Sequence, residues 1–414
     1  MTEAGGTEAG GRRAIVVGGS MGGLFAGLLL RRAGWEVVIC ERAGEALASR
    51  GAGIVTHPEL HEAMVAAGAD PGDALGVEVE GRIVLDRDGT ALCRMELPQI
   101  LTSWGRAYRF LRAACPDGIY RHGKALARID QAPGRVTAHF ADGTAETGDL
   151  LVAADGILST ARRQLLPSAE PAYAGYCAWR GLVDEDELSP AAHDRLLRHV
   201  AFCLPPREQM LGYPVAGANE DIRPGHRRFN FVWYRPVDRE TGLRHLFTSA
   251  DGRDYGTAIP PHRIREDVIA GMRADADQLL APEFAEAVRR TRSPFLQAIF
   301  DLETPAMAVG RVALLGDAAF VARPHVGMGV TKAAGDAMAL VRALGTAPDI
   351  DAALAAYDAE RREYGARVIR RARHLGAYMQ AQVLSDDERA QAERHRSPEA
   401  VMTETAVSTG LERW

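Results

Sequence analysis

The residues best suited to chemistry lie between 314 and 329, where a single carboxylate follows a hydrophobic run. Asp317 stands within Leu314-Leu315-Gly316-Asp317-Ala318-Ala319, and Pro324 and Gly327-Met328-Gly329 then lead into a helix-like stretch. The carboxylate could accept a hydrogen bond from a ribityl hydroxyl, and free backbone N–H groups at a helix start favour negative charge on a facing ring. A reduced flavin carries such a charge, so the segment predicts the flavin half of an FAD site. Taken alone, it could also be a strand end followed by an N-cap.

A glycine-rich turn near the N-terminus predicts the other half of the nucleotide site. Residues 13–17 have the pattern of a buried strand, Gly18-Gly19-Ser20-Met21-Gly22-Gly23 turns into an apolar helix over 24–33, and a strand over 36–40 ends in Glu41. Glycines let the backbone approach a pyrophosphate at a helix N-terminus, and an acid about 20 residues later can hold a ribose hydroxyl. Ser20 replaces the middle glycine of the fingerprint, and we expect the close approach to survive. The flanking strands and Glu41 favour this interpretation over an ordinary tight turn.

Composition favours a cytoplasmic enzyme of two or three structural units. The chain has 414 residues, of which 47% are hydrophobic, and its net charge of -6 gives no reason to expect nucleic acid or acidic membranes as partners. No run approaches the roughly 18 apolar residues of a membrane span, and the first residues do not resemble a signal peptide. The five cysteines form no Cys-x-x-Cys pair and no metal-binding spacing, which fits reduced thiols and predicts no metal site.

The order of the expected elements predicts an α/β fold: a discontinuous Rossmann-like FAD-binding domain, a substrate domain with a mixed or antiparallel sheet, and C-terminal helices. Strand-like composition dominates residues 173–261 and includes Leu246-Phe247-Thr248. The other expected elements are hairpins at 82–97 and 135–147, a strand at 149–154, and helices at 105–114, 263–280, 283–290 and within 350–395.

Because the two halves of the nucleotide site lie near opposite ends of the chain, the cofactor domain must be discontinuous. We expect it to comprise 12–72, 105–172 and 292–345. The substrate domain would comprise 73–104 and 173–291 and would cover the flavin. Residues 346–395 would form the C-terminal helices, and residues 1–11 and 396–414 would be flexible tails.

Three motifs in register resemble the single-component FAD-dependent aromatic hydroxylases, the p-hydroxybenzoate hydroxylase-like group. They are the turn at 18–23 with Glu41, the pair Asp155-Gly156, and the segment 316–329. The resemblance extends to about residue 375. A finer similarity, to the 2,6-dihydroxypyridine 3-hydroxylase-like members, rests on the segments 173–176, 179–181, 212–214, 230–234 and 323–325.

The resemblance implies which residues hold each part of FAD. Asp317 would bind the ribityl chain, and Asp155 would face both flavin and reductant. Arg42 and Arg109 would lie near the ribose and pyrophosphate, unless they are ordinary surface arginines. The ADP half would be held by Gly18, Ser20, Gly22, Gly23 and Glu41, and the isoalloxazine ring would be lined by Pro324, Gly327, Met328 and Gly329.

The activity implied by the resemblance is hydroxylation of an electron-rich aromatic such as a hydroxypyridine or a phenol. NAD(P)H would reduce the FAD, and O2 would then form a flavin C(4a)-hydroperoxide that transfers one oxygen atom. The chain has no second Gly-x-Gly-x-x-Gly, so NAD(P)H is expected to visit only transiently.

A base or acceptor near the substrate would raise the nucleophilicity of its ring. The candidates are His325, beside Pro324, then Tyr213 and, less favoured, His199. Arg180, Tyr213, Trp233 and His325 could line the substrate cavity, although each could equally be ordinary sheet packing.

Two other functions could use the same cofactor site. A flavin-dependent halogenase usually carries a Trp-x-Trp-x-Ile-Pro segment, which residues 231–234 do not match. A non-catalytic FAD-binding sensor would keep the site and lose oxygen transfer. We expect the monooxygenase, acting on a small aromatic substrate as a monomer or a homodimer.

Overall fold

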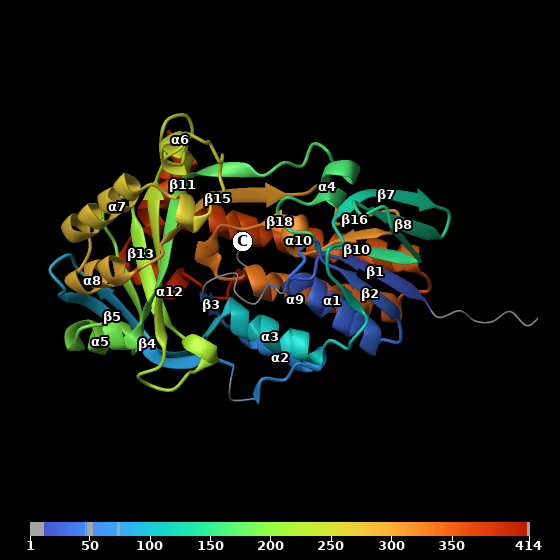
Figure 1. The fold of residues 1–414 in the computed structure, drawn as a ribbon, viewed down its shortest axis with the longest axis horizontal. Helices are drawn as coiled ribbons and strands as arrows, with labels where there is room; N and C mark the ends of the chain where they lie inside the picture. Colours follow the sequence, from blue (N-terminus) through green and yellow to red (C-terminus); the bar gives the residue numbers. More distant parts are fainter. Residues whose placement is uncertain (1–11, 46, 48–52, 73–74, 412–414) are drawn as a thin grey trace, which may run out of the picture.

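A six-stranded sheet forms the core of the cofactor half of the molecule (Figure 1). The computed structural model describes residues 12–45, 47, 53–72 and 75–411. The sheet has the order β16-β17-β10-β1-β2-β6 and is parallel except for the pair β16–β17. Its strands are β1 (Arg13–Val17), β2 (Glu36–Cys40), β6 (Tyr120–Arg121), β10 (Leu150–Ala153), β16 (Ala308–Val309) and β17 (Val312–Leu314). The central strands are apolar and buried, as parallel strands covered on both faces must be.

Helices cover one face of this sheet and a second, smaller sheet covers the other (Figure 1). The helices are α1 (Met21–Arg32), α2 (Pro58–Ala66), α3 (Trp104–Ala114) and α9 (Gly329–Thr346). The smaller sheet contains β7 (Leu126–Ala132), β8 (Arg135–Phe140) and β9 (Ala145–Gly148), next to α4 (Thr160–Leu165). The predicted hairpin at 135–147 and the helix at 105–114 are thereby confirmed.

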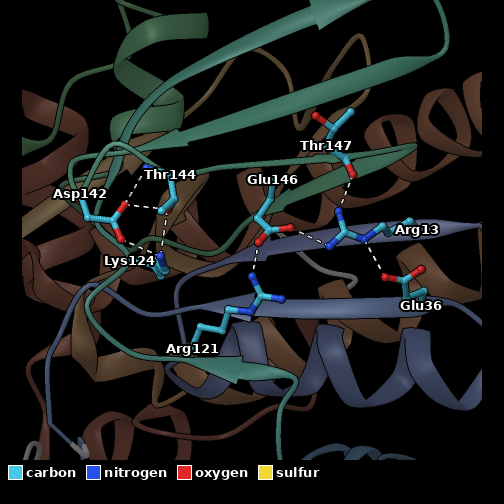
Figure 2. A network of polar contacts seen from close by, with 8 residues as sticks. All are labelled: Arg13, Glu36, Arg121, Lys124, Asp142, Thr144, Glu146 and Thr147. Atoms are coloured by element: carbon cyan, nitrogen blue, oxygen red, sulfur yellow. Dashed lines mark hydrogen bonds and ion pairs between the residues drawn. The ribbon is translucent and has the colours of Figure 1, made fainter.

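A polar network ties the small sheet to the six-stranded sheet (Figure 2). Arg13 at the start of β1 donates to Glu36 of β2 at 2.8 Å and to Glu146 of β9 at 2.6 Å. Arg121 of β6 also pairs with Glu146. The Glu146 carboxylate of β9 therefore joins the small sheet to β1 and β6.

A nine-stranded, largely antiparallel sheet forms the other half of the molecule, in the order β18-β15-β11-β14-β13-β12-β4-β5-β3. One of its faces packs on α5 (Pro190–Leu196), α6 (Gly242–Phe247), α7 (Glu266–Leu279) and α8 (Pro282–Arg290). The other face lies toward the cofactor half. Its strands are β3 (Gly53–Val55), β4 (Val77–Leu85), β5 (Ala91–Ser103), β11 (Ala172–Asp184), β12 (His199–Cys203), β13 (Gln209–Val215), β14 (Arg228–Pro236), β15 (Phe295–Glu303) and β18 (Phe320–Val321).

The α/β fold class and the predicted β4–β5 hairpin are confirmed, and three local expectations are wrong. Residues 295–303 pair with β11 and 53–55 pair with β5, so both segments belong to the nine-stranded sheet and not to the FAD-binding domain. Leu246 and Phe247 lie in α6, not in a strand, because Asp238 accepts backbone N–H bonds before this helix and Phe247 is buried under it.

The expectation of a flexible C-terminal tail is also wrong. After α10 (Ile350–Gly376) and α11 (Asp386–His395), the chain forms α12 (Pro398–Glu404), which buries Val401 and Met402 against β4 and β5. Arg82 of β4 donates to the backbone oxygens of Met402 at 2.6 Å and Thr405 at 2.7 Å. The expected N-terminal tail, residues 1–11, and residues 412–414 lie outside the described residues. Among the described helices, none is long and apolar enough to span a membrane.

Candidate cofactor and substrate site

A cavity of about 410 Å³ lies at the carboxyl ends of β1, β2 and β10. Parallel strands on either side of β1 connect in opposite directions, and nucleotides bind at such switch points. The cavity wall combines the glycine turn after β1, the acid after β2, the pair after β10 and the start of β7. The predicted cofactor residues in this wall are Gly18, Ser20, Glu41, Arg42 and Asp155.

The glycine turn is packed so closely that side chains would not fit. A Cβ added to Gly23 would lie 1.7 Å from the Gly18 oxygen, and one added to Gly22 would lie 2.7 Å from Leu315 Cδ2. Gly18 has φ of 104°, in the region that favours glycine. Ser20 occupies the N-cap position of α1 without capping it. Its small side chain lies where a helix N-terminus can receive an anionic group.

Glu41 holds the glycine turn while forming the end of the cavity. The side chain is only 5% exposed, and its two oxygens accept the backbone N–H groups of Gly19 at 2.7 Å and Ala43 at 2.8 Å. Arg42 lines the cavity beside it. Lys124 also lines the cavity and is held by Asp142 at 2.6 Å, as Figure 2 shows.

Arg109 lies on α3 and pairs with a residue of the other half of the molecule. Its side chain is half exposed and pairs with Glu220, and it does not line the described cavities. A position of Arg109 near the cofactor ribose and pyrophosphate stays a prediction; in the structure its side chain lies on the face of α3 that is turned toward Glu220.

Asp155 offers an unsatisfied acceptor to the cavity. Its Oδ2 atom accepts the backbone N–H of Thr160 at 2.8 Å, whereas its buried Oδ1 atom has no hydrogen-bond partner among the described residues. A buried carboxylate oxygen without a donor is costly, and a ligand hydroxyl would satisfy it.

A second cavity, of about 370 Å³, continues from the first. The two share Ser20, Trp104, Ala154 and Gly156, so they lie end to end. Beyond these shared residues, the second wall comes from both halves of the molecule. It contains Met21, Gly22, Gly53, Ile54, Arg180, Gln297, Leu315, Gly316, Asp317, Gly329, Val330 and Ala333.

Asp317 faces this second cavity from a short 3-10 helix, η5 (Gly316–Ala318), on a turn that a buried ionic cluster holds rigidly. Asp317 is exposed at the cavity surface, and desolvation by the surrounding protein raises the pKa of its carboxyl, an effect that the charge of Lys332 opposes. Asp336 accepts the Gly316 N–H at 3.0 Å, and Lys332 donates to the Gly316 oxygen at 3.2 Å and to Asp336 at 2.8 Å. Arg361 of α10 completes the cluster by donating to Asp336 at 2.8 Å.

Of the four residues predicted to line the ring, only Gly329 lies in the wall of the cavity, at the first turn of α9. Met328 is 2% exposed and packs with Val368 on α10. Gly327 packs closely against the C-terminal segment, since an added Cβ would lie 2.6 Å from Ala406 Cβ. Pro324 begins the 3-10 helix η6 (Pro324–Val326) and is not part of the described wall. For these three positions, contact with the ring stays a prediction.

His325 is enclosed by protein on all sides. It is 1% exposed, with Nε2 at 2.8 Å from the Tyr176 hydroxyl and Nδ1 at 3.0 Å from Gln209 Oε1. Burial lowers the pKa of His325 to about 3, and the nearby Arg323 guanidinium adds to this effect. The expected role as a base, and as a substrate contact, does not fit this position.

The other predicted substrate residues lie at different depths. Arg180 lines the second cavity and donates to Gln297 at 3.1 Å. Tyr213 is buried next to Asn230 behind Gly53, and burial raises its pKa to about 12. Trp233 lies on the opposite face of the sheet, where it packs with α7 and α8 and donates to Glu208 at 2.8 Å. His199 lies on β12, outside both cavity walls.

Several wall residues were missed by the sequence analysis. Trp104 lies between the two cavities, and its ring stacks on that of Tyr108 with the ring centroids 4.9 Å apart. The sequence signal that could have indicated Trp104 is a helix start after Ser103, a residue type favoured at N-caps. In the structure, the Ser103 hydroxyl accepts the Arg106 N–H at 3.0 Å. Gln297 and Gly53 carried no comparable signal, since their positions depend on strands paired across more than 40 residues.

Several known proteins are similar to this chain in sequence and in fold. A family model described as FAD binding domain-like matches residues 173–301. The 2,6-dihydroxypyridine 3-monooxygenase of Paenarthrobacter nicotinovorans is 29% identical over 369 residues, covering 89% of this chain and 91% of that protein. The aurachin C monooxygenase/isomerase of Stigmatella aurantiaca is 31% identical over 364 residues, covering 84% and 85%. A 3-amino-4-hydroxybenzoate 2-monooxygenase of Streptomyces cremeus is 31% identical over 379 residues, covering 88% and 86%.

The fold agrees with these similarities. The solved structure of 2,6-dihydroxypyridine-3-hydroxylase from Arthrobacter nicotinovorans matches with a TM-score of 0.84 and 28% identity, over 92% of this chain and 96% of that one. The chain belongs to the FAD-dependent aromatic monooxygenases. FAD is therefore its cofactor, small aromatic molecules and O2 are its substrates, and NAD(P)H is the reductant typical of such hydroxylases. The relatives give no support to a halogenase or to a non-catalytic sensor.

Proposed function

We propose that this enzyme hydroxylates a small aromatic ring that already carries a hydroxyl group, such as a hydroxypyridine, in the second cavity. The observation that carries the proposal is the pair of end-to-end cavities, which run from Glu41 to Asp317 and end at Arg180 and Gln297 of the nine-stranded sheet. The names of the relatives describe activity on 2,6-dihydroxypyridine and on 3-amino-4-hydroxybenzoate, which supports a hydroxylated ring as the substrate.

The residues present fit FAD along this path. The closely packed turn at 18–23 would receive the pyrophosphate, and Glu41 would meet the adenosine ribose. Asp155 would accept a cofactor hydroxyl at its unsatisfied oxygen, and Asp317 would accept one from the ribityl chain. Bound FAD, once reduced, supplies activated oxygen from O2.

The protein positions the reacting groups and excludes water from the second cavity. Gly329 and Val330 bring the N-terminus of α9 to the second cavity, where its positive end favours negative charge. Ile54, Val330 and Ala333 give the wall an apolar part that excludes water, which would otherwise intercept activated oxygen. Arg180 and Gln297 supply polar groups from the facing sheet.

NAD(P)H as a transient visitor belongs to the same proposal, because the sequence contains one glycine-rich dinucleotide turn. The five free cysteines support a reducing, cytoplasmic setting. Assembly as a homodimer is a further expectation, which sedimentation of the FAD-loaded protein would test.

The experiment is a panel of hydroxypyridines, phenols and hydroxybenzoates added to FAD-loaded enzyme with NADH or NADPH in air. We expect some hydroxylated ring to accelerate NAD(P)H oxidation and to gain one oxygen atom from isotopically labelled O2, with little hydrogen peroxide. If the protein holds FAD and no member of a broad panel gains oxygen, the proposed function is wrong.

A further inference from the structure

Arg180 is the one basic side chain in the described wall of the second cavity. It projects from β11 on the sheet face that is turned toward the cofactor half, and Nη1 donates to Gln297 Oε1 at 3.1 Å. Its buried Nε atom has no hydrogen-bond partner among the described residues. A buried guanidinium N–H without an acceptor is costly, and a ligand oxygen would supply one.

No carboxylate in the described part of the chain pairs with Arg180. Asp317 is the other charged residue of this wall, and the remaining polar neighbour is the neutral Gln297. The positive charge acts on Tyr213 of β13 and Tyr234 of β14, where it opposes the effect of burial on the pKa of both hydroxyls. Arg180 therefore places a positive charge in the space between the sheet and the cofactor half.

The same wall holds no group suited to removing a proton from a substrate hydroxyl. The described lining contains no histidine and no lysine, and Asp317 is the predicted partner of the cofactor. His325 has both ring nitrogens occupied by Tyr176 and Gln209. Tyr213, like any tyrosine, is protonated at neutral pH, and burial moves its pKa further up, to about 12.

We propose that the enzyme selects substrates that already carry an oxyanion on the ring, and that Arg180 is the residue that recognises this oxyanion. The inference rests on the proposed function and names the charge state of its substrate. The substrate loses its proton to water before binding, so the site needs no internal base. An ionised ring oxygen also donates electrons to the ring, which makes the carbon that accepts oxygen more nucleophilic.

The oxyanion could be an ionised ring hydroxyl or a ring carboxylate, and both bind a guanidinium in the same way. The pH dependence of ligand binding distinguishes a ring hydroxyl from a ring carboxylate. Binding of a ring whose only acidic group is a hydroxyl tightens as the pH rises through the pKa of that free ligand. Binding of a ring carboxylate stays constant from about pH 6 to about pH 9, because the carboxylate is ionised throughout.

The test is equilibrium binding to FAD-loaded enzyme, followed by the change in flavin absorption, without reductant. The ligands are two hydroxypyridines whose hydroxyl groups ionise at different pH values, a hydroxybenzoate, and the O-methyl derivative of each hydroxypyridine. The variants are Arg180→Gln, Arg180→Lys and, as a control, Arg94→Gln, an exposed arginine on β5 of the same sheet.

We expect the wild-type dissociation constant for each hydroxypyridine to follow the pKa of that ligand. Arg180→Gln should weaken anion binding about 10- to 100-fold, the cost of a lost charged hydrogen bond, and should flatten its pH dependence. Arg180→Lys should keep the pH dependence at lower affinity, and Arg94→Gln should match wild type. The methyl ethers should bind weakly to every variant.

The inference fails if wild-type binding of the hydroxypyridines shows one midpoint that is independent of the ligand, or if the methyl ethers bind as well as the anions. It also fails if Arg180→Gln loses affinity for neutral and anionic ligands alike. The proposed function is judged separately, by oxygen insertion. Turnover of a hydroxypyridine whose binding does not depend on pH would remove the oxyanion requirement and leave the hydroxylase in place.

Discussion

The Tyr176 hydroxyl lies 2.8 Å from His325 Nε2, and this contact assigns His325 to the framework of the enzyme. Burial lowers the pKa of His325 to about 3, so its ring is neutral at neutral pH; Gln209 Oε1 can only accept a hydrogen bond, so Nδ1 carries the single proton and Nε2 accepts from Tyr176. Both ring nitrogens are therefore occupied by protein groups. It fastens η6 to β11 and β13 of the nine-stranded sheet, and the backbone oxygen of His325 accepts the N–H of Ala406 at 2.7 Å.

Replacing His325 should change stability and its pH dependence more than chemistry. The folded-state pKa is about 3, against about 6.5 for an unfolded histidine, so the unfolded chain binds an extra proton between these values. His325 thus makes the wild-type free energy of unfolding fall as the pH falls through this window. His325→Gln should lose roughly 1–3 kcal/mol at neutral pH and remove that part of the acid sensitivity.

Urea unfolding of wild type and His325→Gln across the same pH series measures the effect. The difference between the two proteins isolates His325 from the other buried histidines, such as His57, whose pKa burial also lowers. The pH profile of kcat should be the same in both proteins. A limb of the kcat profile that disappears in His325→Gln would restore the histidine as a base.

Asp317 should govern retention of FAD. Its carboxylate faces the second cavity, and Asp317→Asn would weaken a charged hydrogen bond to the ribityl chain by roughly 1.5–3 kcal/mol, or about 10- to 100-fold in the FAD dissociation constant. Fluorescence titration of the apoprotein with FAD measures this change. Asp117→Asn, at an exposed aspartate after α3, is the control and should bind FAD as wild type does. Equal affinity in all three proteins would remove Asp317 from the cofactor site.

Gly23→Ala should damage the cofactor half directly. The added Cβ would lie 1.7 Å from the Gly18 oxygen, which is a backbone atom that cannot move without opening the turn. We expect weaker FAD binding and a lower Tm. Gly345→Ala is the matched control, since this exposed helical glycine has open space around its Cβ position and should gain up to about 1 kcal/mol from helix propensity. Unchanged FAD affinity in Gly23→Ala would mean that the turn does not approach the cofactor.

The cofactor half could be predicted from the sequence because its signals are local. The turn at 18–23 and Glu41 follow one another within about 25 residues of the βαβ unit, and strand period, glycine spacing and the final acid all agree. Asp317 is likewise fixed by a short apolar strand before it. The predicted residues that lie in the wall of one of the two cavities are Gly18, Ser20, Gly22, Glu41 and Asp317, whereas Gly23 packs against the Gly18 oxygen.

The substrate half could not be predicted to the same depth because its geometry depends on distant pairings. His325 was chosen for its place beside Pro324, but Tyr176 and Gln209, more than 100 residues away, turn its ring away from the cavity. The aromatic run at 229–234 was correctly assigned to a strand, yet alternation places Trp233 and Asn230 on opposite faces. Which face meets the cofactor depends on the order of strands in the sheet.

The C-terminal segment should depend on Arg82 for its position. This arginine is 1% exposed and donates to the backbone oxygens of Met402 and Thr405 as well as to Gln99, and burial lowers its pKa to about 10. Arg82→Gln would leave these buried oxygens unsatisfied, so we expect a Tm lower by several degrees and faster proteolytic cleavage within residues 396–411. Arg87→Gln, at an exposed arginine of the β4–β5 turn, is the control and should resist protease as wild type does. Ala406 donates its backbone N–H to the His325 oxygen and packs closely against Gly327. We therefore expect the variant that is cleaved faster in this segment also to bind FAD more weakly. Cleavage at the wild-type rate in Arg82→Gln would show that the buried side chains of α12 hold the segment without this arginine.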